Sequence, residues 1–381
     1  MLLSIYSILG LLYWAFLSAW LIINGSKILP LSSIPNPENK RVPSVVIIIA
    51  ARNEEYALKQ ALVSVCTLDY SNYRVLVIND RSTDNSGHIL KDLQAKYNNL
   101  SVMNINTLPQ GWLGKNHALY MGFKCSDEEY MLFTDADVLY HKDVLSKAMG
   151  YCLKNNLDHL TILPGITSPS SILNGVILTF IIILTAVQRP WAAKIKSSKA
   201  SMGVGAFNLV ARQAYKKAGT HTVIAMRPDD DLKLGAYIKA SGGAADVLYG
   251  QKELQVEWYA SVKDLISGLM KNVFSGFDYN IFKAIGGALG ILLFFVLPLP
   301  VILIFGNFAE RIGATCIFLF QAILYWKMSG SNEKWWYAFM SIYAGLIITY
   351  IIIKSAIVTL YKGGIYWRDT FYSLAELRKN R

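Results

Sequence analysis

Apolar residues in this chain fall into runs of two lengths. The short runs, such as Val45 to Ala50 and Tyr73 to Ile78, are continuous, as in strands covered on both faces. Each is followed by polar residues and then by helical spacing, first over 57–66 and then to about residue 97. Further strands are predicted at 100–105, at 244–248 and in Tyr130 to Tyr140, and the segment Gln255 to Tyr259 follows the strand at 244–248. This alternation predicts an α/β fold built on a largely parallel sheet.

The long apolar runs predict membrane segments. Leu2 to Ile23 is uncharged and long enough to span a bilayer, so it predicts an uncleaved anchor. Lys27, Lys40 and Arg41 follow it, which places its C-terminal end in the cytosol. Three more apolar segments lie at 288–305, 312–325 and 336–360. If all three segments crossed the membrane, the basic tail would lie on the opposite side from a cytosolic catalytic domain. One segment is therefore expected to be re-entrant.

The apolar run from Ser171 to Val187 interrupts the α/β pattern. A membrane span here would put the residues before it and after it on opposite sides. A helix lying at the membrane interface is the better interpretation, with Arg189, Lys194, Lys196 and Lys199 as headgroup anchors. The segment 266–282 also has the spacing of an amphipathic surface helix. The predicted organisation is an anchor at 1–24, a linker at 25–43, a catalytic domain at 44–261 with the interfacial helix at 171–187, an amphipathic segment at 262–287, transmembrane segments at 288–361 and a basic tail at 362–381.

Composition supports a soluble module joined to membrane segments. The mean hydropathy is +0.33, only 17% of residues are charged, and the net charge is +11. Because the basic residues lie beside apolar runs, an anionic lipid surface explains the charge better than nucleic acid does. Four cysteines, at 66, 125, 152 and 316, have no short spacing, which argues against a zinc site or a disulfide framework.

The stretch from Tyr130 to Tyr140 carries the main candidate chemistry. Its apolar part ends at Thr134, and Asp135 and Asp137 follow. Because residues i and i+2 of a strand face the same side, these two carboxylates could face one point just past the strand end, at the sheet edge where α/β proteins bind ligands. Such oxygen ligands suit a divalent cation that also binds phosphates. The alternative is an Asp that ends the strand and another that caps the next helix.

Other polar residues follow the strand ends. Asp80 could bind a base or ribose, or cap the following helix. Lys115 could reach a phosphate, or be a solvated lysine at a helix start. Asp229 to Asp231 suit a helix N-terminus by charge alone, although crowded carboxylates also raise a pKa toward that of a general base. GxGxxG and GxxxxGK[ST] loops are absent, which disfavours dinucleotide and P-loop chemistry.

Four motifs stand in order: ARNEE, NDRSTD, TDAD and DDDLKLG. Together with Gly114-Lys115 they resemble the inverting family 2 glycosyltransferases of the GT-A fold, over roughly residues 44–261. GWLGK, the GVGAFNLVARQAYKKAGTH block and the tail KGGIYWRDTFY look most like the membrane-bound branch. That branch includes carotenoid glycosyltransferases of the diaponeurosporenoate and chlorobactene type and, more remotely, hopanoid-associated and ceramide transferases.

The resemblance implies a role for each matching residue. It implies that Ala50, Arg52, Glu54 and Asp80 hold the nucleoside, and that Lys115 lies near the nucleotide. Asp137, with Asp135, would bind Mg²⁺ or Mn²⁺, and Asp135 would face the ribose or the metal water. Asp231 would be the catalytic base, supported by Asp230. Gly205 to Asn208, with Gly205 and Phe207 as contacts, would lie near the acceptor.

The expected function is transfer of one sugar from a nucleoside diphosphate sugar, preferably a UDP-sugar, to a membrane lipid acceptor such as a carotenoid or hopanoid. The expected location is the plasma membrane, with several spans and a cytoplasmic catalytic domain. Two alternatives remain open. A processive polysaccharide synthase is disfavoured because Gln255-Val256-Glu257-Trp258-Tyr259 departs from the QxxRW sequence of that class. A catalytically inactive membrane-binding module is the other.

Overall fold

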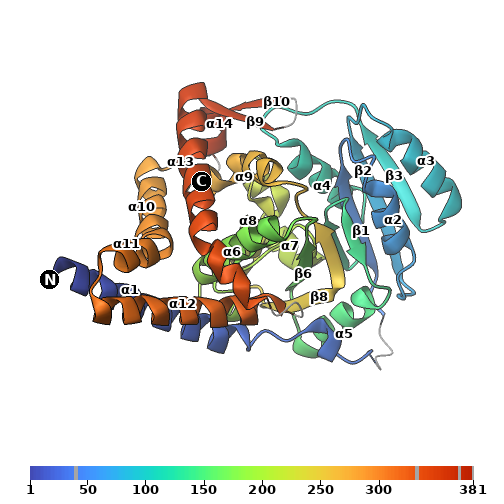
Figure 1. Cartoon of the computed structure of the whole chain (residues 1–381). Coiled ribbons are helices and arrows are strands. Elements are labelled where there is room, and N and C mark those ends of the chain that lie inside the picture. Colours follow the sequence, from blue (N-terminus) through green and yellow to red (C-terminus); the bar gives the residue numbers. More distant parts are fainter. Residues whose placement is uncertain (38–41, 331–333, 368–369, 380–381) are drawn as a thin grey trace.

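The computed structural model describes residues 1–37, 42–330, 334–367 and 370–379. An α/β body with a central sheet occupies one side of the molecule, and a group of long helices occupies the other (Figure 1). The N-terminal helix α1 lies in the helical part, whereas the C-terminal elements return to the top of the α/β body. The predicted α/β class is confirmed.

The central sheet has eight strands in the order β3-β2-β1-β4-β7-β6-β8-β5. Strands β3, β2, β1 and β4 pair in parallel, as do β6 and β8, whereas β7 and β5 pair antiparallel to their neighbours. The strands are β1 Val45–Ala51, β2 Tyr73–Asp80, β3 Leu100–Ile105, β4 Tyr130–Thr134, β5 Val138–Tyr140, β6 His159–Thr167, β7 Asn208–Ala211 and β8 Ala245–Glu257.

Helices cover both faces of this sheet, and strand β1 is almost completely buried between them. Apolar side chains of β1 alternate between two core clusters, with Val46 and Ile48 in one and Ile47 and Ile49 in the other. That is why the strand reads as a continuous apolar run. The helices of the body are α2 Leu58–Cys66, α3 Ser86–Lys96, α4 Gly114–Lys124, α5 Val144–Asn155, α7 Arg212–Lys217 and α8 Asp230–Ala240.

Three features of the sheet differ from the prediction. Strands β6 and β7 have no counterpart in it, and the predicted strand in Tyr130 to Tyr140 is divided into β4 and β5. The strand predicted at 244–248 and the residues Gln255 to Glu257 belong to the single strand β8, which pairs with β6 across a register shift between Pro164 and Gly165. Asp135 and Asp137 lie just past the end of a strand, as expected: β4 ends at Thr134, and both residues lie in the connection to β5.

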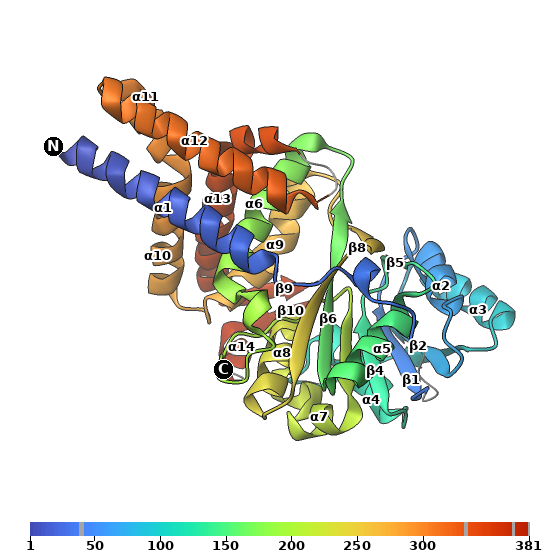
Figure 2. The ribbon, with the colours of Figure 1, turned by 90° about the horizontal axis from the view of Figure 1, so that it is seen from below.

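The helical part contains α1 Leu2–Gly25, α6 Ser171–Gln188, α9 Val262–Gly276, α10 Ile281–Ile291, α11 Pro298–Phe305, α12 Phe308–Met328 and α13 Ser341–Lys362. A π-helical turn, Leu292–Val296, joins α10 to α11, and short 3₁₀ turns lie at Leu31–Ser33, Pro190–Ala192, Thr220–Ile224 and Trp335–Met340. Helices α1 and α12 run side by side, and α13 crosses them steeply (Figures 1 and 2).

Four helices are long and apolar enough to cross a membrane: α1, α6 with its following turn, α12 and α13 with its preceding turn. A fifth would be the pair formed by α9 and the 281–296 segment, which is bent by 119°. The amphipathic helix predicted at 266–282 therefore ends at Gly276. The apolar segment predicted at 288–305 is likewise broken, because Pro298 lacks the N–H group needed to continue the helix and instead begins α11.

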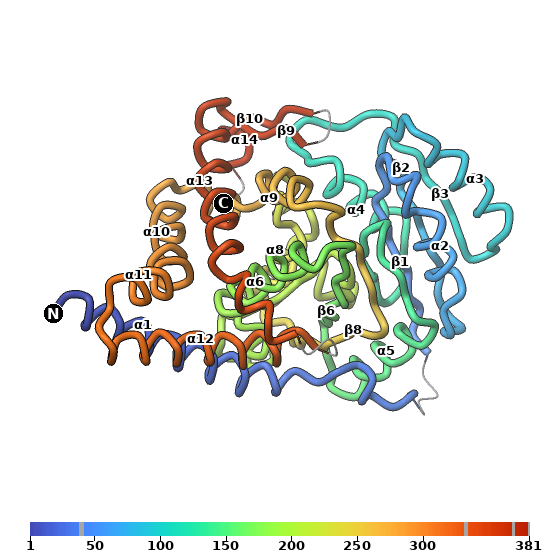
Figure 3. The backbone as a smooth tube through the Cα atoms, in the orientation of Figure 1, coloured from blue at the N-terminus to red at the C-terminus, as the bar shows by residue number. Residues whose placement is uncertain are grey.

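The basic tail is folded. Strands β9 Gly364–Trp367 and β10 Thr370–Ser373 form a hairpin, and α14 Leu374–Lys379 follows. In the tube view this hairpin lies beside the segment that leads into α4 (Figure 3). Of the basic residues noted in the sequence, Lys40, Arg41, Arg368 and Arg381 lie outside the described residues, as does Asp369.

Candidate active site

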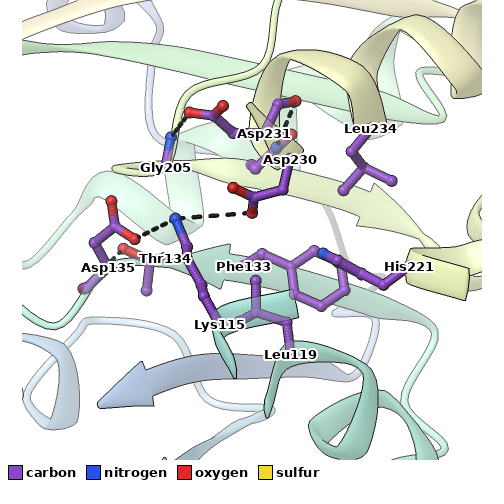
Figure 4. Close-up of a pocket in the computed structure, with 11 residues that line it drawn as sticks. Lys115, Leu119, Phe133, Thr134, Asp135, Gly205, His221, Asp230, Asp231 and Leu234 are labelled. Atoms are coloured by element: carbon purple, nitrogen blue, oxygen red, sulfur yellow. Dashed lines mark hydrogen bonds and ion pairs between the residues drawn. The ribbon is translucent and has the colours of Figure 1, made fainter. Parts of the chain in front are cut away.

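A small pocket opens at the carboxyl end of β4. Figure 4 shows side chains from α4, the turn after β4, the loop before β7 and the start of α8 converging on it. Its lining includes Lys115, Asp135, Gly205, Asp230 and Asp231. These five residues come from widely separated parts of the sequence, and all five were predicted from the motifs.

Lys115 lies at the centre of the pocket. Its Nζ atom is 2.8 Å from Asp135 Oδ1 and 3.7 Å from Asp230 Oδ2. Burial alone would lower the pKa of Lys115, but Asp135, Asp230 and Asp231 outweigh burial and raise it above its usual range. Lys115 is therefore a fixed positive charge between two carboxylates. A solvated lysine at a helix start, the alternative considered from the sequence, is wrong.

The carboxylates at the start of α8 face different partners. Asp231 accepts hydrogen bonds from the N–H groups of Gly205 and Leu232, at 2.8 and 2.7 Å. Asp230 instead points toward Lys115 (Figure 4). Burial raises the pKa of Asp230 to about 7, with Lys115 opposing the shift and Asp231 adding to it. Burial also raises the pKa of Asp231. Crowded, desolvated carboxylates of this kind are suited to accept a proton near neutral pH.

Asp137 lies two residues after Asp135, in the connection between β4 and β5. Burial raises its pKa to about 7, and the charges of Asp135 and Glu54 contribute to that shift. Asp137 precedes β5 and does not begin a helix, because α5 starts at Val144 with Asp143 as its N-cap. Within the described ranges, no group of three His, Cys, Asp or Glu side chains could hold a metal ion. Asp135 and Asp137 nevertheless offer the hard oxygen atoms that Mg²⁺ and Mn²⁺ prefer, and the mutual repulsion of these carboxylates would be relieved by a cation.

The loop before β7 allows the two acidic motifs to approach each other. The N–H of Asp135 donates to Gly205 O at 2.9 Å. A Cβ atom on Gly205 would lie 2.3 Å from Asp135 Oδ2, and one on Gly203 would lie 1.9 Å from Asp231 O. The loop therefore needs both glycines. Phe207 corrects a prediction: it is fully buried against Tyr140 in the core and supports the loop from beneath, so it does not line the pocket.

The residues predicted to hold the nucleoside surround the end of β2. Asp80 is buried there and forms two hydrogen bonds with Arg81, at 2.7 and 2.9 Å, while Arg52 Nη1 lies 3.9 Å from Asp80 Oδ2. Arg81 has a φ of +56°. Ala50 lies within β1 beside Ile78, and the N–H of Glu54 donates to Ser86 at 2.9 Å. Asp80 thus meets cations and does not cap α3.

Sequence reasoning missed several buried polar residues that hold this site. The side chain of Asn116 donates to Ile224 O and Arg227 O, at 2.8 and 2.9 Å. Arg227 forms two hydrogen bonds with Asp229, whose Oδ1 also accepts from Ser275. In the sequence, the opposite charges of Arg227 and Asp229, two residues apart, were the signal that could have indicated this ion pair. Nothing local in the sequence indicates that Asn116 would reach this segment.

An α/β sheet with acidic motifs at its carboxyl edge defines the class of GT-A glycosyltransferase folds. Residues 46–217 match the family model described as Glycosyl transferase family 2. The chain therefore carries a domain of glycosyltransferase family 2, as the motifs predicted.

Curated relatives divide between two kinds of product. The chain is 27% identical over 219 residues to a poly-beta-1,6-N-acetyl-D-glucosamine synthase of Staphylococcus epidermidis, covering 57% of this chain and 49% of that protein. It is 35% identical over 106 residues to a beta-monoglucosyldiacylglycerol synthase of Nostoc sp., covering 27% of this chain and 22% of that protein. For the 4,4'-diaponeurosporenoate glycosyltransferase of Staphylococcus haemolyticus, the identity is 34% over 103 residues, with 26% of each chain covered. The chain thus spans about half or less of the length of these relatives.

One solved structure resembles nearly the whole chain. A mannosyltransferase from Pyrobaculum calidifontis, solved with GDP-Man and Mn²⁺, superposes with a TM-score of 0.55 at 16% identity. The superposition covers 94% of this chain and 99% of that one. At this level of identity the likeness establishes the fold alone and leaves the substrates open.

Proposed function

We propose that this protein is an inverting glycosyltransferase that moves one sugar from a nucleoside diphosphate sugar to a lipid acceptor in the membrane. The observation that carries the proposal is the position of Lys115 between Asp135 and Asp230. One cation and several carboxylates with raised pKa values converge at the sheet edge. A departing diphosphate needs the cation, and an attacking hydroxyl needs a carboxylate base.

On the donor side, Asp80 and Arg52 would hold the nucleoside, preferably a uridine, with Ala50 and Glu54 beside it. Lys115 would contact the diphosphate. Asp137 and Asp135 would hold Mg²⁺ or Mn²⁺, which when bound neutralises charge on the leaving diphosphate. The neighbouring mannosyltransferase structure contains Mn²⁺.

On the acceptor side, Asp231 is the proposed base. Its carboxylate lines the pocket and is fixed by the N–H groups of Gly205 and Leu232. Asp231 takes a proton from the acceptor hydroxyl as the hydroxyl oxygen attacks the anomeric carbon from the face opposite the diphosphate. Asp230 stays paired with Lys115 and supports this arrangement. A carboxylate acceptor would depend less on Asp231, because it carries no proton at neutral pH.

The helical part would hold the protein in the membrane and supply the lipid. Helix α6 is among the helices with the length and composition of a span. However, β6 before it and β7 after it pair in one sheet, so both ends of the α6 segment return to the same body. We therefore propose that α6 lies along the interface, beside α13.

The folded tail bears on the orientation of the helices. It packs on the α/β body, so an even number of crossings must separate α9 from β9. The hydroxyl of Ser4 donates to Glu310 at 2.7 Å, which joins the start of α1 to the start of α12 at the end farthest from the sheet (Figure 2). We propose that α1, the broken α10–α11 segment and α12 cross the membrane, with α13 along the interface.

In sealed vesicles, an impermeant thiol reagent should label exposed Cys125 and a Lys379→Cys variant from the same side. Labelling from opposite sides would contradict this topology.

A processive polysaccharide synthase is the second candidate, favoured by the match to the N-acetylglucosamine polymer synthase. Against it, Gln255 to Glu257 lies in β8 without the Arg of QxxRW. Product length separates the two functions. Purified protein in lipid nanodiscs, given radiolabelled UDP-sugars and Mn²⁺, should form a single lipid-soluble product. A ladder of oligosaccharides would overturn single transfer in favour of the polymer synthase. An absence of any transfer from a full donor and acceptor panel would instead favour the inactive binding module.

A further inference from the structure

Asp229 is the first carboxylate of the acidic motif, yet its side chain does not cap the helix that it begins. It stands at the N-cap of α8, where an Asp usually accepts a hydrogen bond from an N–H group of the first helical turn. In α8, all of which the structure describes, the Asp229 side chain makes no such bond. Its carboxylate faces Arg227 and Ser275 instead. Among the described residues, Asp230 and Asp231 line the pocket and Asp229 does not, so neither capping nor the pocket accounts for Asp229.

Arg227, Asp229 and Ser275 form a buried network between the start of α8 and the end of α9. The Nε and Nη2 atoms of Arg227 donate to the two carboxylate oxygens of Asp229, at 2.8 and 2.7 Å. The hydroxyl of Ser275 donates to Asp229 Oδ1 at 2.8 Å, and Arg227 Nη2 also donates to Ser275 O at 3.2 Å. The side chains of Arg227 and Asp229 are 2% and 9% exposed, and Ser275 is fully buried. Solvent ions therefore screen this network much less than they screen a surface ion pair.

The network attaches α8 to the bend between α9 and α10. Ser275 is the last residue but one of α9, and the chain bends by 119° between α9 and residues 281–296. In this bend, Asp278 has a φ of +53°. Its two carboxylate oxygens lie 3.7 Å from Lys233 Nζ of α8 and 3.0 Å from Lys283 Nζ of α10. Because α9 packs in one apolar cluster with α6 and α13, the first turn of α8 is joined to the helical part of the molecule.

The residues that follow Asp229 in α8 are the carboxylates of the pocket. Asp230 and Asp231 come directly after it, and Asp231 is also held by the N–H of Gly205 at 2.8 Å. A buried ion pair is a costly way to stabilise a fold, since apolar side chains of similar volume often stabilise it as well or better. The fixed geometry that Arg227 and Asp229 give to the start of α8 explains this pair better than stability does.

We propose that Arg227, Asp229 and Ser275 are positioning residues that fix the start of α8, and with it the Asp231 carboxylate, to the α9–α10 bend. The inference rests on the proposed function, since it takes Asp231 as the base and a membrane lipid as the acceptor. The helices that hold the protein in the membrane then also hold the base, so the base and the acceptor hydroxyl keep one relative position. The proposed donor contacts Asp80 and Lys115 are not part of this network. Loosening the network should therefore slow transfer without weakening donor binding.

The test compares Ser275→Ala with Ser267→Ala in the full-length protein in lipid nanodiscs. Both serines lie on α9, but Ser267 is exposed and donates to Lys263 O of its own helix, so it controls for losing a serine hydroxyl. Ser275→Ala removes one hydrogen bond to the Asp229 carboxylate and leaves the ion pair in place. Transfer is measured with Mn²⁺ and radiolabelled UDP-glucose, UDP-galactose and UDP-N-acetylglucosamine, with a lipid extract of the expressing cells in the nanodiscs.

We expect kcat of Ser275→Ala to fall about ten-fold, the size of one hydrogen bond to a charged group, with the donor KM nearly unchanged. Hydrogen–deuterium exchange in the first turn of α8 should be faster in Ser275→Ala and unchanged in Ser267→Ala. Unchanged exchange in Ser275→Ala overturns the attachment of α8 to α9. Faster exchange, or a lower melting temperature, with an unchanged kcat overturns the positioning role, because the network would then serve stability alone.

Failure of the proposed function gives a different result. A wild-type protein that transfers no sugar overturns the proposed function and the positioning of a base together, while the exchange comparison still decides the attachment. Should Ser275→Ala not yield folded protein, the double variant with Arg227→Met and Asp229→Leu decides the same kcat and exchange questions. It replaces the buried pair with apolar side chains, which often preserves a fold, and it removes no cap from α8.

Discussion

Replacing Lys115 with Met tests the charge balance of the site. Met keeps much of the apolar length of the side chain but removes the cation that lies 2.8 Å from Asp135 and 3.7 Å from Asp230. At an effective dielectric constant of about 20, these two attractions are worth about 6 and about 4.5 kcal/mol before desolvation is subtracted. The Asp135 side chain is 40% exposed, so water screens the first attraction, whereas the Asp230 side chain is only 5% exposed.

Breaking a buried pair typically costs 3–5 kcal/mol, because the remaining charge loses its partner. For Lys115→Met we expect a loss of about 3 kcal/mol in the free energy of unfolding, measured by urea denaturation in detergent, and a fall in kcat of at least about 100-fold. Lys124→Met is the matched control, since Lys124 is exposed at the end of the same helix. A Lys115→Met protein as stable and as active as Lys124→Met would refute the assigned role of this cation.

Three further predictions concern the carboxylates and the loop. Asp231→Asn should lower kcat about 100-fold or more while leaving the KM for the donor nearly unchanged, because it removes a base and little donor binding. A raised donor KM with an unchanged kcat would instead point to a binding role. Gly205→Ala should raise the donor KM at least about ten-fold, because its Cβ would lie 2.3 Å from Asp135 Oδ2, whereas Gly286→Ala, with open space around it, should not. Folding raises the pKa of Asp230 to about 7, from about 4 in the unfolded chain. Between these pH values the native state holds the extra proton. The free energy of unfolding therefore falls as pH rises, by at most about 1.4 kcal/mol per pH unit. Asp230→Asn should flatten the dependence measured by denaturant midpoints, and an unchanged slope would contradict the buried charge.

The parallel half of the sheet and most of the pocket were predictable from local patterns. Strands β1 and β2 contain continuous apolar runs, and the acidic motifs lie at the end of β2 and directly after β4. The same pattern placed Asp135 and Asp137 just past a strand end, but it could not show that the N–H of Asp135 bonds Gly205 O, because Gly205 is distant in the sequence. Strand β7 was hidden because its four residues lead directly into α7.

Contacts between distant segments account for what the sequence did not predict. Phe207 stands in a loop motif, yet the packing of Tyr140 against it decides that it is core. The tail carries few apolar residues of its own and folds because Tyr372 and Leu377 enter a cluster built by the helices and the loop before α4. The break in the predicted 288–305 segment is a local effect, because Pro298 lacks the N–H group that a continuing helix needs.

The central claim is that a single sugar is transferred to a membrane lipid at the Asp231 site. Mass spectrometry of lipid extracts tests it most directly, in cells that produce the wild-type protein, the Asp231→Asn variant or neither. We predict a lipid heavier by one sugar residue with the wild-type protein only. Extracts identical in all three cells, or a series of products carrying successive sugars, would contradict the account.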